Sequence, residues 1–243
     1  MEAARLKARS GVPHTIVYRR GVCCDEYELP NYDNEAEAEA EVHWQRHLQH
    51  LQTFPEEFKN NKHLVWIENI NEPDKERPEW LAKFSFHTAL KAMAAGYSYA
   101  AFSWASGTPE PYAWEGPEME NFLRVAAQYP DRIAIALHEY DYWHPTLRDS
   151  YPSFVGRFER LFEVCDAKGI SRPTVLITEF GWPGIPPAEE MMQADNVPWA
   201  DGLYAGYPQV KGAALWDPRG DMSEHVAALT TYSLQNYFAI PRE

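Results

Sequence analysis

Cysteine, long apolar runs and a surplus of basic residues are what this sequence has least of. Three cysteines occur among 243 residues, and two of them, Cys23 and Cys24, are adjacent. This odd count argues against a disulfide framework, and there is no Cys-x-x-Cys pair to suggest a zinc site. No apolar run approaches the roughly 20 residues that a membrane-spanning helix needs, so we expect no membrane partner.

Basic residues are scarce relative to acidic ones. Lys and Arg number 22 against 36 Asp and Glu, which gives a net charge of −14 at pH 7. Nucleic-acid binding needs clustered Lys and Arg, so a nucleic-acid partner is not expected. A neutral partner fits better, although the charge could simply keep the surface solvated. Residues 1–20 lack an apolar segment of the secretory type, which predicts a cytoplasmic protein or a fragment of a secreted one.

Strand-like and helix-like segments alternate along the whole chain, without an internal repeat or linker, so we predict a single domain over residues 1–243. Near-continuous apolar strands separated by helices are typical of a parallel sheet covered by helices. The predicted strands are 14–20, 63–73, 97–107, 132–145, 173–184 and 210–218, and the predicted helices are 34–60, 78–96, 116–131, 153–169 and 223–238.

Two α/β architectures fit this alternation, a TIM (β/α)8-type barrel and an open doubly wound sheet. No Gly-rich phosphate turn follows the first strand, which counts against a nucleotide-binding open sheet. Polar or aromatic residues end four of the strands, and a barrel carries its active site at that rim. We therefore predict the barrel. The strand-end residues are Asn71 with Glu72, His138 with Tyr140, Glu179, and Trp216.

Glu72 and Glu179 are the strongest chemical candidates. They lie 107 residues apart, which is three βα units of roughly the length found in barrels. Two strand-end carboxylates that face one cleft can act as an acid and a nucleophile. Strand alternation places Glu179 on one face with Val175 and Ile177, whereas Glu139 is predicted to point away from the cleft.

The strand ends also carry a family resemblance. "NINEP", which ends in Asn71-Glu72-Pro73, resembles the acid/base motif of the clan A glycoside hydrolases, and "LITEFGW" resembles their nucleophile strand. Three further segments match in the expected order. Glu68 stands four residues before Glu72, like the buried Glu in many "WE-x-x-NEP" strands of the family, His138 and Tyr140 stand in "HEY", and Trp216 stands in "GAALWDP".

This resemblance implies a retaining glycoside hydrolase on a (β/α)8 barrel that cleaves a β-linked glycan without a cofactor. Glu72 would be the acid/base and Glu179 the nucleophile. Asn71 would bind a sugar hydroxyl, Tyr140 would donate to Glu179, and His138 would hold Glu72 or a hydroxyl. The aromatic faces for sugar rings would be those of Trp216, Trp182, Trp143 and Trp104.

Each candidate also has a structural interpretation. Glu72 could be an exposed loop residue, Glu179 a satisfied buried carboxylate, His138 structural, and Trp104 part of the core. Glu68 is expected to be a structural partner of Arg19 or Arg20, because an unpaired buried carboxylate is costly. We expect no metal site, because no carboxylate–His set has ligand spacing in the sequence.

The strand count departs from the family pattern. Counting back from Glu72 makes 14–20 the third strand of the barrel, so the first two βα units are missing and the barrel is incomplete or a fragment. Its open edges and apolar interior would favour a homo-oligomer that covers the gap. The alternative function is a non-catalytic carbohydrate-binding or inactive barrel that lacks a complete site.

Overall fold

The protein is described by a computed structural model over residues 15–20, 29–141, 143–181 and 188–215, with a few isolated positions in the flanking segments. Trp182, Trp216, Cys23 and Cys24 lie outside these residues. The helix predicted at 223–238 lies largely outside them too, and the five positions described within it are helical. No described helix is long and apolar enough to cross a membrane.

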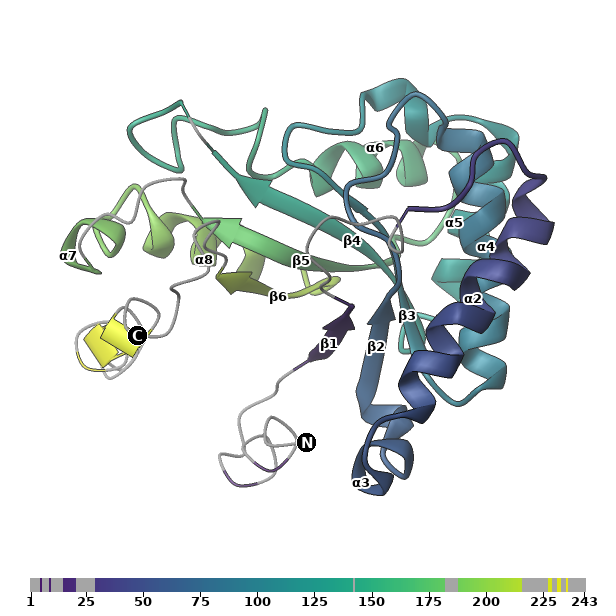
Figure 1. Cartoon of the computed structure of the whole chain (residues 1–243). Coiled ribbons are helices and arrows are strands. Elements are labelled where there is room, and N and C mark those ends of the chain that lie inside the picture. Colours follow the sequence, from purple (N-terminus) through teal and green to yellow (C-terminus); the bar gives the residue numbers. More distant parts are fainter. Residues whose placement is uncertain are drawn as a thin grey trace.

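A single curled sheet of six parallel strands organises the described part of the chain (Figure 1). Each strand pairs with its neighbours in the sequence, in the order β1 to β6. This order requires a crossover between every two strands, which explains the alternation with helices. The strands are β1 (Ile16–Arg19), β2 (Val65–Glu68), β3 (Ser98–Trp104), β4 (Ile133–Tyr140), β5 (Thr174–Gly181) and β6 (Val210–Leu215).

The crossover helices cover the outer, convex face of the sheet (Figure 1). Two of them begin with a proline, whose fixed φ suits the first helical turn, and α4 is followed by Gly96 at φ 93°, a conformation that favours glycine. The helices are α2 (Ala36–Gln52), α3 (Glu56–Lys59), α4 (Pro78–Ala94), α5 (Pro117–Gln128), α6 (Phe158–Ala167), α7 (Ala188–Met191) and α8 (Val197–Ala205), with 3-10 turns η1 (Lys62–Leu64) and η2 (Pro111–Trp114).

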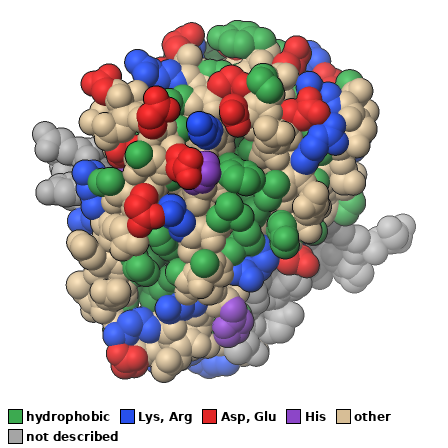
Figure 2. Space-filling view, turned by 90° about the vertical axis from the view of Figure 1, so that its right-hand side faces the viewer, with side chains coloured by type: hydrophobic (Ala, Val, Ile, Leu, Met, Phe, Trp, Pro, Cys, Tyr) green, Lys and Arg blue, Asp and Glu red, His purple; other side chains and the backbone are tan. Residues whose placement is uncertain are grey.

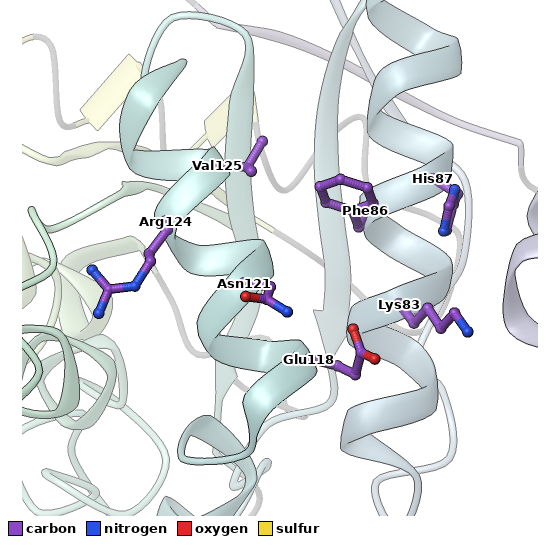
Figure 3. Close-up of a pocket in the computed structure, with 7 residues that line it drawn as sticks. All are labelled: Lys83, Phe86, His87, Glu118, Asn121, Arg124 and Val125. Atoms are coloured by element: carbon purple, nitrogen blue, oxygen red, sulfur yellow. The ribbon is translucent and has the colours of Figure 1, made fainter.

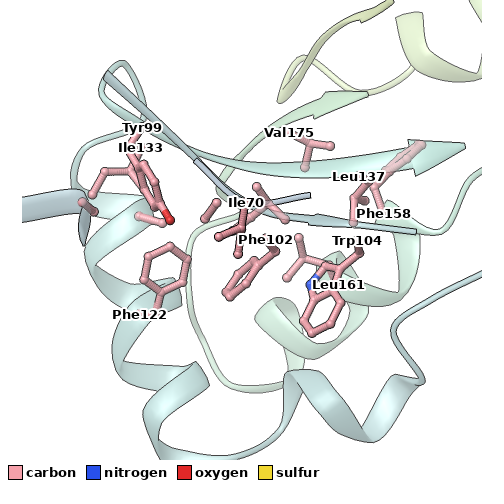
Figure 4. Close-up of a cluster of buried hydrophobic side chains, with 14 of the residues drawn as sticks. Ile70, Tyr99, Phe102, Trp104, Phe122, Ile133, Leu137, Phe158, Leu161 and Val175 are labelled. Atoms are coloured by element: carbon pink, nitrogen blue, oxygen red, sulfur yellow. The ribbon is translucent and has the colours of Figure 1, made fainter. Parts of the chain in front are cut away.

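The main apolar core lies between this outer face and the helices (Figure 4). Alternate residues of β4, Ile133, Ile135 and Leu137, point into it and are almost completely buried. Phe122 of α5 and Phe158 of α6 meet them from the helical side. Burial of such side chains contributes roughly 1.5–3 kcal/mol each, so this layer holds the sheet and the helices together.

The inner, concave face of the sheet carries a smaller apolar cluster with three alanines. Ala100, Ala134, Ala136 and Leu176 form a second cluster and are at most 3% exposed. An exposed apolar interior was expected from the strand count, and for these residues that expectation is wrong. Val17 and Trp66 pack against this cluster and are partly buried, whereas the association of copies stays a prediction.

All six predicted strands are present, but 63–73 is strand only over β2. Alternation stops after Asn69, which bonds outward to His43 of α2 and to Tyr99, because Ile70 joins the outer core as well. The predicted helix 34–60 is divided into α2 and α3, and the α7 and α8 helices were not predicted. The sequence "NVPWADGLYA" contains Pro and Gly, which lower the helix propensity of α8.

Candidate active site

Glu72 sits in the loop that follows β2, and its backbone is in the left-handed region with φ 44°. A non-glycine residue pays for this conformation, so its surroundings must hold it there. Its backbone N–H donates to the carbonyl oxygen of Ser103 at 3.0 Å. The side chain is 35% exposed, so its carboxylate can be reached from outside.

Glu179 lies on β5 and its side chain is only 4% exposed. Strand alternation predicts that Glu179 shares the inner face with Val175 and Ile177. That reason is wrong, because both residues belong to the outer core. Leu137 of β4 pairs with Ile177, and the next residue, His138, pairs with Glu179. Thr178 is therefore an extra residue, a β-bulge that turns Glu179 to the inner face.

His138 and Tyr140 join the two carboxylates. The Nδ1 atom of His138 is 3.1 Å from Glu72 Oε1 and 3.5 Å from Glu179 Oε2. The Tyr140 hydroxyl donates to Glu72 Oε1 at 2.5 Å. The predicted contact of His138 with Glu72 is thus present, whereas the expected donation from Tyr140 to Glu179 is wrong, because the hydroxyl points to the other carboxylate.

Arg19, at the end of β1, supplies the positive charge of the site. Its Nη2 atom donates to Glu179 Oε1, and its Nη1 atom is 3.8 Å from Glu68 Oε2 and 3.4 Å from His138 Nε2. The predicted pairing of Glu68 with a β1 arginine is confirmed. The contact of Arg19 with Glu179 was missed, although the alternation of Val17 and Arg19 on one face could have indicated it.

The pKa values of the two carboxyls shift in opposite directions. Hydrogen bonding to His138 lowers the pKa of Glu72 most, with further help from Tyr140, against the opposing effect of burial. Burial raises the pKa of Glu179, although the charges of His138 and Arg19 oppose it. Without substrate, the arrangement therefore favours the ionised form of Glu72 more than that of Glu179.

Glu139 confirms the predicted alternation of β4, because it points to the outer side between the inward His138 and Tyr140. Its carboxylate is completely buried and accepts the backbone N–H groups of Gly156 and Arg157 at 2.8 and 3.0 Å. Burial raises the pKa of this carboxyl to about 7. Glu139 thus anchors the loop before α6.

Trp104 was proposed to bind substrate, and the structure shows this to be wrong. It is completely buried in the outer core and stacked on Phe102 (Figure 4). It also contacts Trp114. Phe102 pairs with Ala136 and Trp104 with the next residue of β4, so Ser103 is an extra residue that reverses the alternation.

Asn71 remains a candidate for binding polar groups. Its side chain is partly exposed, and its Oδ1 atom is buried without a hydrogen-bond partner among the described residues. Trp143 is 72% exposed, so its ring is accessible. The proposed contacts of Trp182 and Trp216 with substrate lie outside the described residues and stay predictions.

Glu72, His138 and Glu179 each offer one ligand atom, and these three atoms lie within 4.8 Å of one another. The three residues come from different strands, which is why spacing in the sequence did not indicate a carboxylate–His set. Such a set could hold a metal ion. However, the guanidinium of Arg19 already donates to Glu179 and opposes a second cation there.

The helical side of the molecule offers less chemistry. Acidic and basic side chains are interspersed on the face drawn in Figure 2. A hollow of about 360 Å³ between α4 and α5 has Phe86 and Val125 beside Lys83, Glu118 and Asn121 (Figure 3). It lacks paired carboxylates, so the inner face remains the candidate site.

The sequence matches no family model and no curated protein sequence. The geometry of the site therefore carries the functional argument.

Proposed function

We propose that this protein is a retaining glycoside hydrolase that cleaves a β-linked glycan, on a TIM-like (β/α)8-type barrel of which six units are seen. The observation that carries the proposal is the separation of the carboxylates, since an oxygen of Glu72 and an oxygen of Glu179 lie within 4.8 Å. Retaining enzymes hold their two carboxyls about 5 to 5.5 Å apart, whereas inverting enzymes need room for a water between them.

In this mechanism, Glu179 attacks the anomeric carbon while Glu72 protonates the departing oxygen. Glu72 then takes a proton from the water that hydrolyses the glycosyl-enzyme. Glu72 suits the first contact with a leaving group because it is the more exposed of the pair. Asn71, the preceding residue, would bind the 2-hydroxyl of the sugar that Glu179 attacks.

The reaction requires a proton on Glu72 when the substrate is bound. Two carboxyls this close do not ionise independently, so the proton resides on the group whose anion is less stabilised. A sugar that displaces the His138 or Tyr140 contact to Glu72 would raise its pKa, while Arg19 keeps Glu179 ionised.

The pKa directions of the substrate-free site also support a second candidate function, a cleft that binds carbohydrate without cleaving it. Both carboxylates already have donors in this arrangement, and the ionised form of Glu72 is the wrong form for an acid. Such a protein would bind oligosaccharides without cleaving them.

Aryl β-glycosides of several sugars test the proposal directly, because a good leaving group needs little acid assistance. We expect release of the phenol by the purified chain. Glu179→Ala should abolish it, and azide should restore it with the product of inverted configuration. Oligosaccharide binding without any turnover would instead establish the non-catalytic function, and Glu179→Ala active without azide would refute the assignment of the nucleophile.

A further inference from the structure

Glu68 is a buried carboxylate that the proposed reaction does not use directly. It is the last residue of β2, on the inner face, and it is 3% exposed. Its Oε1 atom accepts two hydroxyl hydrogen bonds, from Ser103 and from Thr178, each at 2.6 Å. Its Oε2 atom faces Arg19 Nη1 at 3.8 Å. One carboxylate therefore joins β1, β3 and β5 across the sheet.

The two hydroxyl donors occupy special positions. Ser103 is the extra residue of the β3 bulge, between the pairs formed by Phe102 and Trp104 with β4. Thr178 is the extra residue of the β5 bulge, between Ile177 and Glu179. A bulge leaves its extra residue unpaired in the ladder. In this protein the same carboxylate oxygen binds the side chains of both extra residues.

Each bulge in turn places one of the two carboxylates of the site. The carbonyl oxygen of Ser103 accepts the backbone N–H of Glu72, which has a left-handed backbone. Thr178 directly precedes Glu179 and shifts it from the outer face to the inner one. A movement of either bulge would therefore change the distance between Glu72 and Glu179.

We propose that Glu68 is a positioning residue that sets the separation of Glu72 and Glu179 by binding the hydroxyls of Ser103 and Thr178 at the two bulges. This inference rests on the proposed glycoside hydrolase function. Arg19 contacts both Glu68 and Glu179. The negative charge of Glu68 therefore also influences the ionisation of the Glu179 carboxyl.

Thr178→Val is the main test, because valine keeps the branched shape and removes the hydroxyl. We expect kcat to fall by about 100-fold with little change in KM, since a misplacement of about 1 Å costs that much in the transition state. Thr178→Ser keeps the hydroxyl and should restore most of the rate. Thr174→Val is the matched control on the same strand, because its hydroxyl bonds to the Pro130 carbonyl at 2.7 Å, and it should leave kcat unchanged.

Glu68→Gln separates charge from position. The amide oxygen can still accept one or both hydroxyls, but the negative charge is lost. Removal of a negative charge beside Glu179 lowers the pKa of this carboxyl, which is the higher of the pair in the free enzyme, so the alkaline limb of the kcat/KM profile should move to lower pH. A purely structural glutamate would leave this limb where it is, and that result would contradict the electrostatic part of the proposal.

Crystal structures of the wild type and of Thr178→Val provide a readout that does not depend on turnover. We expect the closest oxygens of Glu72 and Glu179 to move beyond their present 4.8 Å limit in the variant. An unchanged separation would overturn the inference even if the protein were an active hydrolase. A changed separation in a protein that cleaves no glycoside would support the positioning role and refute the proposed function. If Thr178→Val does not fold, Ser103→Ala makes the same comparison.

Discussion

Strands β4 and β5 are neighbours of equal length, eight residues each, and each contributes a glutamate near its carboxyl end. On β4 the alternation is regular, so Glu139 points outward to the backbone of Gly156 and serves as an anchor. On β5 one extra residue, Thr178, interrupts the alternation and Glu179 points inward to Arg19. A glutamate thus has a structural role on β4 and belongs to the candidate active site on β5.

The comparison shows that parity predicts the direction of a side chain only where the strand pairing is continuous. Both bulges lie in the second half of their strands, next to the candidate site. Bulges commonly re-aim side chains near active sites. Outward residues should therefore affect stability, and inward ones should affect the reaction.

The largest expected effect comes from the same substitution on both strands. Glu179→Gln removes the nucleophile and should lower kcat by at least about 10⁴-fold. Glu139→Gln should keep kcat close to that of the wild type, because its side chain contacts only the outer layer. Hydrolysis of an aryl β-glycoside measures both. If the folded Glu179→Gln and Glu139→Gln variants lost activity equally, the inward and outward glutamates would not differ in function.

Trp104→Ala should chiefly reduce stability. The bulge at Ser103 turns Trp104 into the outer core, where it is completely buried. Loss of such a side chain costs about 3–5 kcal/mol of the free energy of unfolding. Urea unfolding measures this cost, and oligosaccharide titration of the folded variant at low temperature checks the site. If the variant lost much of its affinity for oligosaccharide but kept normal stability, Trp104 would be a substrate-binding residue after all.

The buried Glu139 should make stability depend on pH. Its pKa is raised to about 7 in the folded protein, so the protonated carboxyl favours the folded state. This contribution to the free energy of unfolding is complete below about pH 4.5 and is lost as pH rises through 7, by at most about 3 kcal/mol. Burial lowers the pKa of His47 to about 4. This residue therefore has the opposite effect, and makes stability rise with pH below about pH 6.5. The wild type should therefore lose stability relative to Glu139→Gln between pH 4.5 and 7. Since His47 is present in both proteins, a constant difference in unfolding free energy over this range would contradict the prediction.

The smallest effect is expected from Tyr140→Phe, an inward position of the regular strand. The change removes the hydroxyl that donates to Glu72, so the pKa of Glu72 should rise. Glu72 has the lower pKa of the pair in the free enzyme, so the acidic limb of the kcat/KM profile should then move up by less than about one pH unit, with a rate change below about tenfold. Tyr151→Phe is a suitable control, because its hydroxyl bonds to Glu159 on the exposed side of the molecule. A downward shift of the acidic limb would show that Tyr140 acts on another group.

Local sequence patterns predicted much of the architecture. Apolar runs of strand length, Pro at the start of α4 and α5, and Gly after α4 and α6 mark where elements begin and end. The order of strands and helices then implied a parallel sheet. The α8 helix was missed because its Pro and Gly weaken a local signal that tertiary packing overrides, with Tyr204 buried against Phe158.

The sequence by itself determined which residue types stand at the strand ends, and therefore that two carboxylates, a histidine and a tyrosine could meet. Only the tertiary structure decided how they meet. The direction of Glu179 and of Trp104 depends on one unpaired residue in each strand, which a two-residue period cannot reveal. The donation of Tyr140 to Glu72 and the contact of Arg19 with Glu179 depend on sheet curvature, because they join strands that are distant in the sequence.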